Sequence, residues 1–246
     1  MKLVLLGTTG YHPSEDRHTP CMLLPDCGMM FDAGTGIFRA PRYLKNGLLM
    51  IFLSHAHADH VIGLTYLLNI ARLHRLDRVV VYGEPDKLAA INQHLFSELL
   101  FPKKPPMEMR PLERDVEVPQ GGRLTHFRLE HPGGSIGFRV DWPDRSLAYV
   151  TDVTAAPGAE YVERIRGVNL LVHECYFPDT HADWARRTFH SWTTPVAQVA
   201  RRAAVGRLVL VHLNPLGDAR DPVGLETARS IFPRTELGHD LMEIDF

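Results

Sequence analysis

One stretch, "LSHAHADHVIG" (residues 53–63), constrains the fold more than any other part of the chain. It holds three of the fourteen histidines, His55, His57 and His60, together with the carboxylate of Asp59. An apolar run precedes it and an apolar run with helical spacing follows it, which places the cluster between a buried strand and a helix. Imidazole and carboxylate groups are the ligands of zinc and similar divalent ions. An ordinary polar surface loop would explain one histidine, but not three beside an aspartate.

Three further polar residues close apolar runs elsewhere in the chain. His131 ends "LTHFRLEH", Asp152 ends "LAYVTD" and His212 ends "RLVLVH". Rigid strands deliver the residues that follow them to one edge of a sheet. Each residue alone is typical of a satisfied strand end, but together they supply the ligands that a site with two metals still needs.

The order of elements predicts an α/β layered fold. Strands and helices alternate in the first and last thirds of the chain, and three strand-like runs joined by turns fill the middle. Helices are expected from Asp59 to about Leu73, over residues 193–204 and over residues 221–232. No low-complexity linker interrupts the chain, so we expect one domain over residues 1–246.

Composition excludes several classes of protein. The 246 residues are 45% hydrophobic and 23% charged, which is ordinary for a globular protein, and the net charge of −2 does not demand a polyanionic partner. We find neither a signal peptide nor an apolar stretch near 18 residues, so no membrane partner is expected. An odd number of cysteines without metal-type spacing indicates reduced thiols and a cytoplasmic location. These cysteines are Cys21, Cys27 and Cys175.

The chain resembles the metallo-β-lactamase superfamily, whose signature is H-x-H-x-D-H. Asp32 in "FDAG", then "HAHADH" and the three strand-end residues follow the order of that superfamily along the whole length. Within it, the chain is similar to the ribonuclease Z branch and its phosphodiesterase relatives. The similarity rests on "GTTG", "HPGGSIGFRV", "LLVHECYFPD" and "RTFHSWTTPVAQVARRAAVGRLVLVHL". The ending "ELGHDLMEIDF" is similar to that of bacterial cyclic phosphodiesterases of the phosphonate pathway.

The resemblance implies a four-layer αββα sandwich with two zinc ions at one edge of the sheets, manganese being the alternative metal. It also implies that Asp32 does not bind a metal itself but orients the histidine loop that does. The implied ligands are His55, His57 and His131 for one ion, Asp59, His60 and His212 for the other, and Asp152 bridging both.

The implied reaction is hydrolysis of a phosphodiester by attack of a metal-bridging hydroxide, with Asp59 among the catalytic residues. In this branch a histidine-glutamate pair at a strand end is followed by a histidine-serine pair that opens a helix. Here these pairs look like His173-Glu174 and His190-Ser191. His190 is then the proton donor to the leaving oxygen, and Glu174 holds its ring. The structural alternatives are that Glu174 is a strand-end carboxylate in an ion pair and that His190 is a surface residue at the start of a helix.

Two differences from the relatives narrow the range of expected substrates. Ribonuclease Z inserts a long basic, glycine-rich arm between the positions matching His131 and Asp152, which are only 21 residues apart here, enough for a hairpin. The phosphonate-pathway relatives carry cysteines for a structural metal near the N-terminus, where "GTTGYHPSEDRH" has none. Without the arm, much of the electrostatic grip on a folded RNA is lost. We therefore expect a small or flexible phosphodiester, or an RNA 3′ end.

Two other functions stay open at this stage. One is a thioesterase or lactonase of the same superfamily, in which "HECYF" and "FHSW" are not expected. The other is a non-catalytic, metal-dependent binding module, which a missing ligand would favour, although the chain lacks none. Dimers are common in this branch, so a homodimer is a further expectation.

Overall fold

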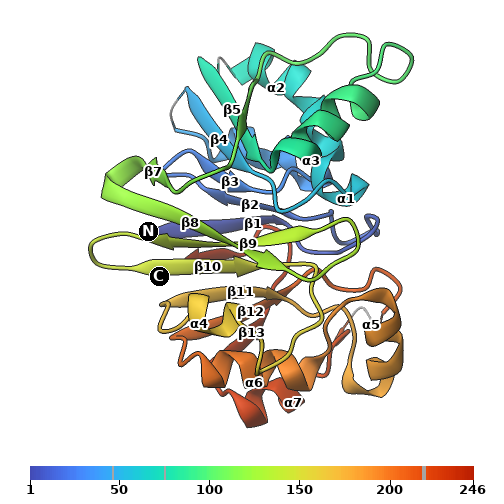
Figure 1. Ribbon diagram of the computed structural model, residues 1–246, viewed down its shortest axis with the longest axis vertical. Helices are drawn as coiled ribbons and strands as arrows, with labels where there is room; N and C mark the ends of the chain where they lie inside the picture. Colours follow the sequence, from blue (N-terminus) through green and yellow to red (C-terminus); the bar gives the residue numbers. More distant parts are fainter. Residues whose placement is uncertain (46, 75, 218–219) are drawn as a thin grey trace. The chain divides into compact units, whose positions relative to one another are not determined.

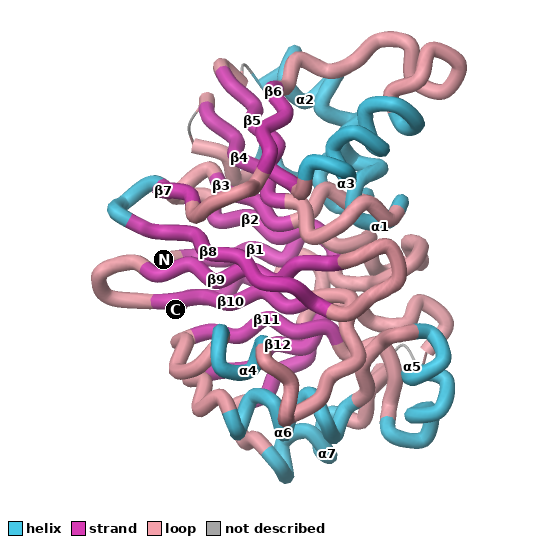
Figure 2. Tube along the Cα trace, viewed as in Figure 1, coloured by secondary structure: helices cyan, strands magenta, loops and turns pink. Residues whose placement is uncertain are grey.

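The chain forms two compact units in the computed structural model, which describes residues 1–45, 47–74, 76–217 and 220–246. Unit 1 comprises Met1–Arg114 and Asp240–Asp245, and unit 2 comprises Asp115–His239 and Phe246. Each unit contains a seven-stranded mixed sheet (Figure 2). Two mixed sheets with their own helices agree with the expected α/β class, whereas a single domain over residues 1–246 stays a prediction.

The sheet of unit 1 changes from antiparallel to parallel at β3. Its strands, in spatial order, are β14 (Glu243–Asp245), β1 (Lys2–Gly7), β2 (Cys21–Leu24), β3 (Met29–Phe31), β4 (Leu48–Phe52), β5 (Arg78–Gly83) and β6 (Glu108–Pro111). The pairs β3–β4, β4–β5 and β5–β6 are parallel. Parallel neighbours end at the same edge of a sheet, so the residues after β3 and β4 lie next to each other.

The sheet of unit 2 combines an antiparallel meander with parallel strands. Its strands, in spatial order, are β13 (Thr235–Leu237), β12 (Arg207–Val211), β11 (Leu170–Glu174), β10 (Ser146–Val150), β9 (Ser135–Asp141), β8 (Gly122–Leu129) and β7 (Val116–Val118). From β10 to β13 the pairs are parallel, and β8 runs antiparallel to β9, which runs antiparallel to β10. Strands β8, β10, β11 and β12 therefore end at one edge.

The helix expected from Asp59 to about Leu73 is broken. It consists of α1 (Ala58–Val61), a 3₁₀ turn (Ile62–Tyr66) and α2 (Leu67–His74). The cause is the loop after β3, because the Gly63 N–H donates to the Ala33 carbonyl at 2.8 Å and the Ala33 N–H donates to the His60 carbonyl at 2.7 Å. A Cβ on Gly63 would lie 2.2 Å from the carbonyl oxygen of Gly34. This close approach fixes the histidine loop against the end of β3.

Successive side chains of a strand point to opposite faces of its sheet, and one face of each sheet packs against helices. In unit 1, Leu49 and Ile51 of β4 share a core with Leu64 and Leu67; α3 (Pro85–Ala90) also contributes to this core. In unit 2, the expected helices are confirmed as α6 (Thr193–Arg202) and α7 (Leu225–Ile231), which lie together on one face of the sheet (Figure 1).

Unit 2 also contains two short helices. They are α4 (Tyr161–Arg164) and α5 (Ala182–Thr188). Sequence periodicity indicates a helix near α4 but gives no signal for α5. No helix among the described residues is long and apolar enough to cross a membrane.

Candidate metal centre

Asp32 organises the strand ends of unit 1. It directly follows β3 and is completely buried. Its carboxylate accepts hydrogen bonds from the Ser54 N–H at 2.8 Å, from the Ser54 hydroxyl at 2.9 Å and from His60 Nδ1 at 2.8 Å. Because Asp32 and Ser54 follow neighbouring parallel strands, the predicted orienting role of Asp32 has a direct structural basis in its contact with His60.

The hydrogen bonds in this cluster fix the tautomers of two histidines. The carboxylate of Asp32 only accepts, so it takes the single hydroxyl proton of Ser54 and the Nδ1 proton of His60. Nδ1 of His55 lies 2.9 Å from Ser54 Oγ and must then donate to it. In the neutral form, both rings therefore carry their proton on Nδ1 and a lone pair on Nε2, which is the tautomer that a metal ligand requires.

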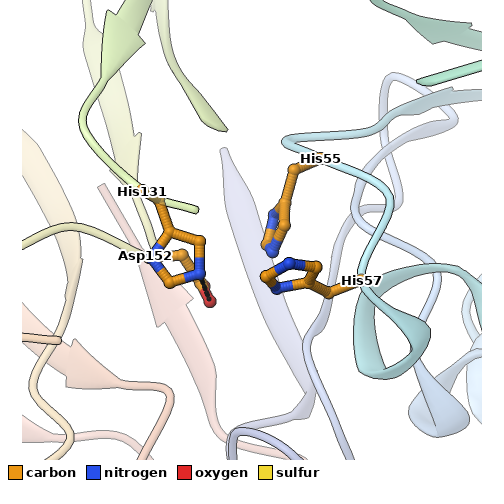
Figure 3. Close-up of side chains that lie close together, drawn as sticks. All are labelled: His55, His57, His131 and Asp152. Carbon is orange, nitrogen blue, oxygen red and sulfur yellow. Dashed lines mark ion pairs between the residues drawn. The ribbon is translucent and has the colours of Figure 1, made fainter. Parts of the chain in front are cut away.

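The other donors of the motif lie beside these rings. The His55 ring lies 4.4 Å from the His57 ring in an edge-to-face arrangement (Figure 3) and 4.2 Å from the His60 ring. Asp59 Oδ2 lies 3.3 Å from His60 Nε2 and accepts the Tyr11 N–H at 2.8 Å. Unit 1 thus gathers the four ligand-type groups that the motif predicts.

The predicted ligands of unit 2 also converge. Asp152 presents Oδ2 3.5 Å from His131 Nε2 (Figure 3) and Oδ1 3.2 Å from His212 Nε2. Nδ1 of His131 donates to the Phe189 carbonyl at 3.2 Å, so the neutral ring has its lone pair on Nε2 here as well. One oxygen of the Asp152 carboxylate therefore faces each of two imidazoles.

Strained backbone marks several of these positions. Asp32, Asp152 and His212 adopt left-handed conformations, with φ of 55°, 47° and 54°, and Phe189 has φ of 60°. Such a conformation costs about 1–2 kcal/mol for a residue with a side chain. The strain turns each side chain sharply as its strand ends, and a structure retains strain of this kind where a site depends on it.

His190 is held by a buried carboxylate. Glu174, the last residue of β11, is completely buried and has both carboxylate oxygens 3.3 Å from His190 Nδ1. The same carboxylate accepts the N–H groups of Val153 at 2.5 Å and Ser191 at 3.2 Å. Tyr176 stacks on the His190 ring with 4.6 Å between centroids and 17° between planes. These contacts fix the ring from its edge and from one face.

Ser191 and His173 support this carboxylate. The Ser191 hydroxyl donates to the Val153 carbonyl at 2.5 Å and accepts the Ala155 N–H at 3.0 Å. These two hydrogen bonds fix the loop after Asp152. His173 Nδ1 donates to the Glu174 carbonyl at 2.7 Å, and Nε2 accepts the Tyr161 hydroxyl at 3.1 Å. Burial lowers the pKa of His173, so its ring is neutral and structural.

Asp152, His190 and His212 each offer a ligand atom, and these atoms lie within 4.8 Å of one another. The ligand-type groups of both units are imidazoles and carboxylates, which are the ligands that zinc and similar divalent ions select. The predicted residues of each unit therefore have the chemistry of metal ligands, and in unit 2 Asp152, His190 and His212 lie close enough to share an ion. Sequence reasoning missed Ser54, Tyr176 and the Phe189 carbonyl. For Ser54 the signal was present, since it ends the apolar run directly before His55.

Comparison with known proteins gives one family. A model described as the beta-lactamase superfamily domain matches residues 28–213. The ribonuclease Z of Archaeoglobus fulgidus is 27% identical over 301 aligned positions, which cover 99% of this chain and 97% of the relative. Because this chain has 246 residues, at least 55 of those positions lack a counterpart in it.

Two solved structures show the same fold over the full chain. The short form of human tRNase Z has a TM-score of 0.76 at 24% identity and covers 100% of this chain and 99% of its own. A diphosphatase from the PhnP family has a TM-score of 0.75 at 20% identity and covers 100% of this chain and 97% of its own. The expected αββα fold class is thereby confirmed.

Proposed function

The chain belongs to the metallo-β-lactamase superfamily, and we propose that it is a metal-dependent phosphodiesterase acting on a small or flexible phosphodiester or an RNA 3′ end. The observation that carries the proposal is the Glu174–His190 pair beside Asp152 and His212. A buried carboxylate that holds an imidazole next to metal-type ligands is the arrangement that a proton donor needs. The full-length similarity to a ribonuclease Z supports the same class of substrate.

We propose that the chain binds two zinc ions, or manganese in their place, and that residues 1–246 act as one functional domain. Bound divalent ions supply charge neutralisation at the phosphate and an activated water. The proposed assignment is His55, His57 and His131 for one ion, Asp59, His60 and His212 for the other, with Asp152 bridging. Asp59 is also the carboxylate that we assign to accept a hydrogen bond from the attacking water.

His190 has the proton-delivering role in this proposal. Its Nδ1 donates to Glu174, so Nε2, on the other side of the ring, is the atom that transfers a proton to the leaving oxygen. As the bond from phosphorus to the leaving oxygen breaks, that oxygen would otherwise depart as a strongly basic alkoxide. The negative charge of Glu174 stabilises the protonated ring until transfer.

The length of the chain bears on the substrate. The link from His131 to Asp152 contains β9 and β10 and their turns, with no room for a long arm. At least 55 positions of the alignment with the ribonuclease Z relative have no counterpart in this chain, which agrees with the loss of a long insertion. We therefore propose that small diesters are cleaved at least as efficiently as precursor transfer RNA. A homodimer stays a prediction.

The test is a substrate panel on the metal-reconstituted protein. Bis(p-nitrophenyl) phosphate, a dinucleotide, a precursor transfer RNA, a thioester and a lactone are each assayed with and without chelator. We expect chelator-sensitive cleavage of the diesters alone. Turnover of the thioester or lactone without the diesters would assign a different branch, and no turnover of any substrate at full metal occupancy would favour a binding module.

His190→Ala separates the role of proton donor from that of metal ligand. We expect it to keep its metal content and to lose activity of about 10²–10⁴-fold on the dinucleotide. The loss on bis(p-nitrophenyl) phosphate should be much smaller, because p-nitrophenolate leaves without a proton. A fall in metal content would instead make His190 a ligand.

A further inference from the structure

A cavity of about 1170 Å³ opens in unit 2 beside His131. Sites for small molecules usually measure about 300–1,000 Å³, so this volume accommodates a nucleoside. Its walls come from the end of β8, from the loop after β10 and from Phe189. The cavity is therefore lined both by a proposed metal ligand, His131, and by the residue before His190.

Phe189 is unusual for three reasons. Its side chain is 49% exposed, although large aromatic residues are ordinarily buried. Its φ of 60° is a conformation that a bulky residue rarely adopts and that glycine adopts without cost. Its carbonyl accepts the Nδ1 proton of His131, a contact that any residue would provide through its backbone. The ring is thus not needed for that contact, which leaves it to serve the cavity that it lines.

The charges around the cavity disfavour a second phosphate group. Glu130 and Glu160 line it with two carboxylates, against the single guanidinium of Arg128. Apolar side chains such as Leu129 and Val153 form much of the remaining wall. An occupant that fits these walls is neutral and apolar on its faces, and it has donors and acceptors at its edges for the charged residues.

We propose that this cavity binds a nucleobase of the substrate, with Phe189 as the surface on which the base stacks. The proposal rests on the phosphodiesterase function proposed above and specifies its substrate as a nucleotide diester. Every base has an apolar face that stacks on an aromatic ring and polar edges that hydrogen-bond. The neighbouring His131 and His190 then place the phosphate of the same nucleotide at the proposed metal site.

The test compares two diesters that share one leaving group. The p-nitrophenyl ester of thymidine 5′-phosphate carries a base, and methyl p-nitrophenyl phosphate does not. We expect the metal-loaded protein to prefer the thymidine ester in kcat/KM. Phe189→Ala should lower this preference by about 5- to 150-fold, the range for loss of one base–aromatic stack. Phe189→Trp should retain it.

Two control variants separate the ring from its backbone and from general aromatic exposure. Phe189→Gly removes the ring and the left-handed strain together, so a loss equal to that of Phe189→Ala assigns the effect to the ring, and recovery would overturn the proposal. Trp184→Ala removes another exposed aromatic side chain, which is 57% exposed on α5 and is not among the described residues that line the cavity. It should leave the preference unchanged.

Binding of thymidine provides a readout that does not depend on turnover. Saturation-transfer NMR of the metal-loaded protein should detect thymidine contacts that Phe189→Ala abolishes and Trp184→Ala retains. If the protein cleaves neither diester but binds thymidine in this way, the phosphodiesterase function fails and the cavity assignment stands. If both diesters are cleaved equally well and thymidine does not bind, the cavity assignment is overturned while the proposed function survives.

Discussion

Replacing Glu174 with glutamine tests how the buried carboxylate contributes to proton delivery. Glu174 accepts from the N–H groups of Val153 and Ser191 and from His190 Nδ1. Glutamine has nearly the same shape as glutamate, but only one of its two terminal atoms is an acceptor oxygen. The other is an NH₂ group, which would face one of these three N–H groups and could not accept its hydrogen bond. A hydrogen bond to a charged group is worth about 1.5–3 kcal/mol. Losing it in the transition state slows the reaction by about 10- to 150-fold.

The assay measures Glu174→Gln on two diesters with different leaving groups. We expect the loss of about 10- to 150-fold on a dinucleotide, whose leaving oxygen needs a proton, and a much smaller loss on bis(p-nitrophenyl) phosphate. Metal content and melting temperature are measured in parallel, so that a damaged site is recognised. Because Glu174 acts through His190, the double variant with His190→Ala should be no slower than His190→Ala alone.

Two results would refute this reasoning. Equal losses on both diesters, with metals retained, would mean that Glu174 does not act on the leaving group. Additive losses in the double variant would mean that Glu174 and His190 act independently.

Three further predictions concern the support of the site and the thiols. Ser54→Ala removes the hydroxyl that joins Asp32 to His55, and we expect weaker zinc binding in a competitive chelator titration; unchanged affinity would contradict the tautomer assignment. Gly63→Ala places a Cβ against a backbone carbonyl and should lower the melting temperature by several degrees, whereas an unchanged value would show that the 3₁₀ turn adjusts. Burial raises the pKa of the Cys27 thiol to about 11, and all three cysteines are buried, so a thiol reagent at pH 8 should label none in the native protein and all three after unfolding.

The sequence was most informative where polar residues end apolar runs. Asp32, Asp152 and His212 each follow a strand, as predicted, because the edge of a sheet is where parallel strands bring such residues together. Their left-handed conformations were not predictable, since only a small fraction of aspartate and histidine residues have φ above zero, although both types are enriched there. The geometry of the ligands therefore depends on tertiary contacts that the local sequence does not encode.

Elements with weak patterns were missed for physical reasons. Strands β6, "EMRP", and β13, "TEL", contain too few apolar residues to show a strand pattern, and their neighbours in the sheet specify them. The helix after Asp59 was expected to be continuous because its apolar spacing is helical, but Gly63 bonds to Ala33 instead. Phe189 gave no signal at all, because its role depends on a cavity formed by segments distant in sequence.

The zinc content of the reconstituted protein, measured by elemental analysis, tests the central claim most directly. Seven ligand-type residues support a dinuclear site, so we predict two zinc ions per chain, with less zinc in the variants His131→Ala and His212→Ala and unchanged content in His190→Ala. One ion or none in the unmodified protein, or full occupancy in either ligand variant, would contradict the account.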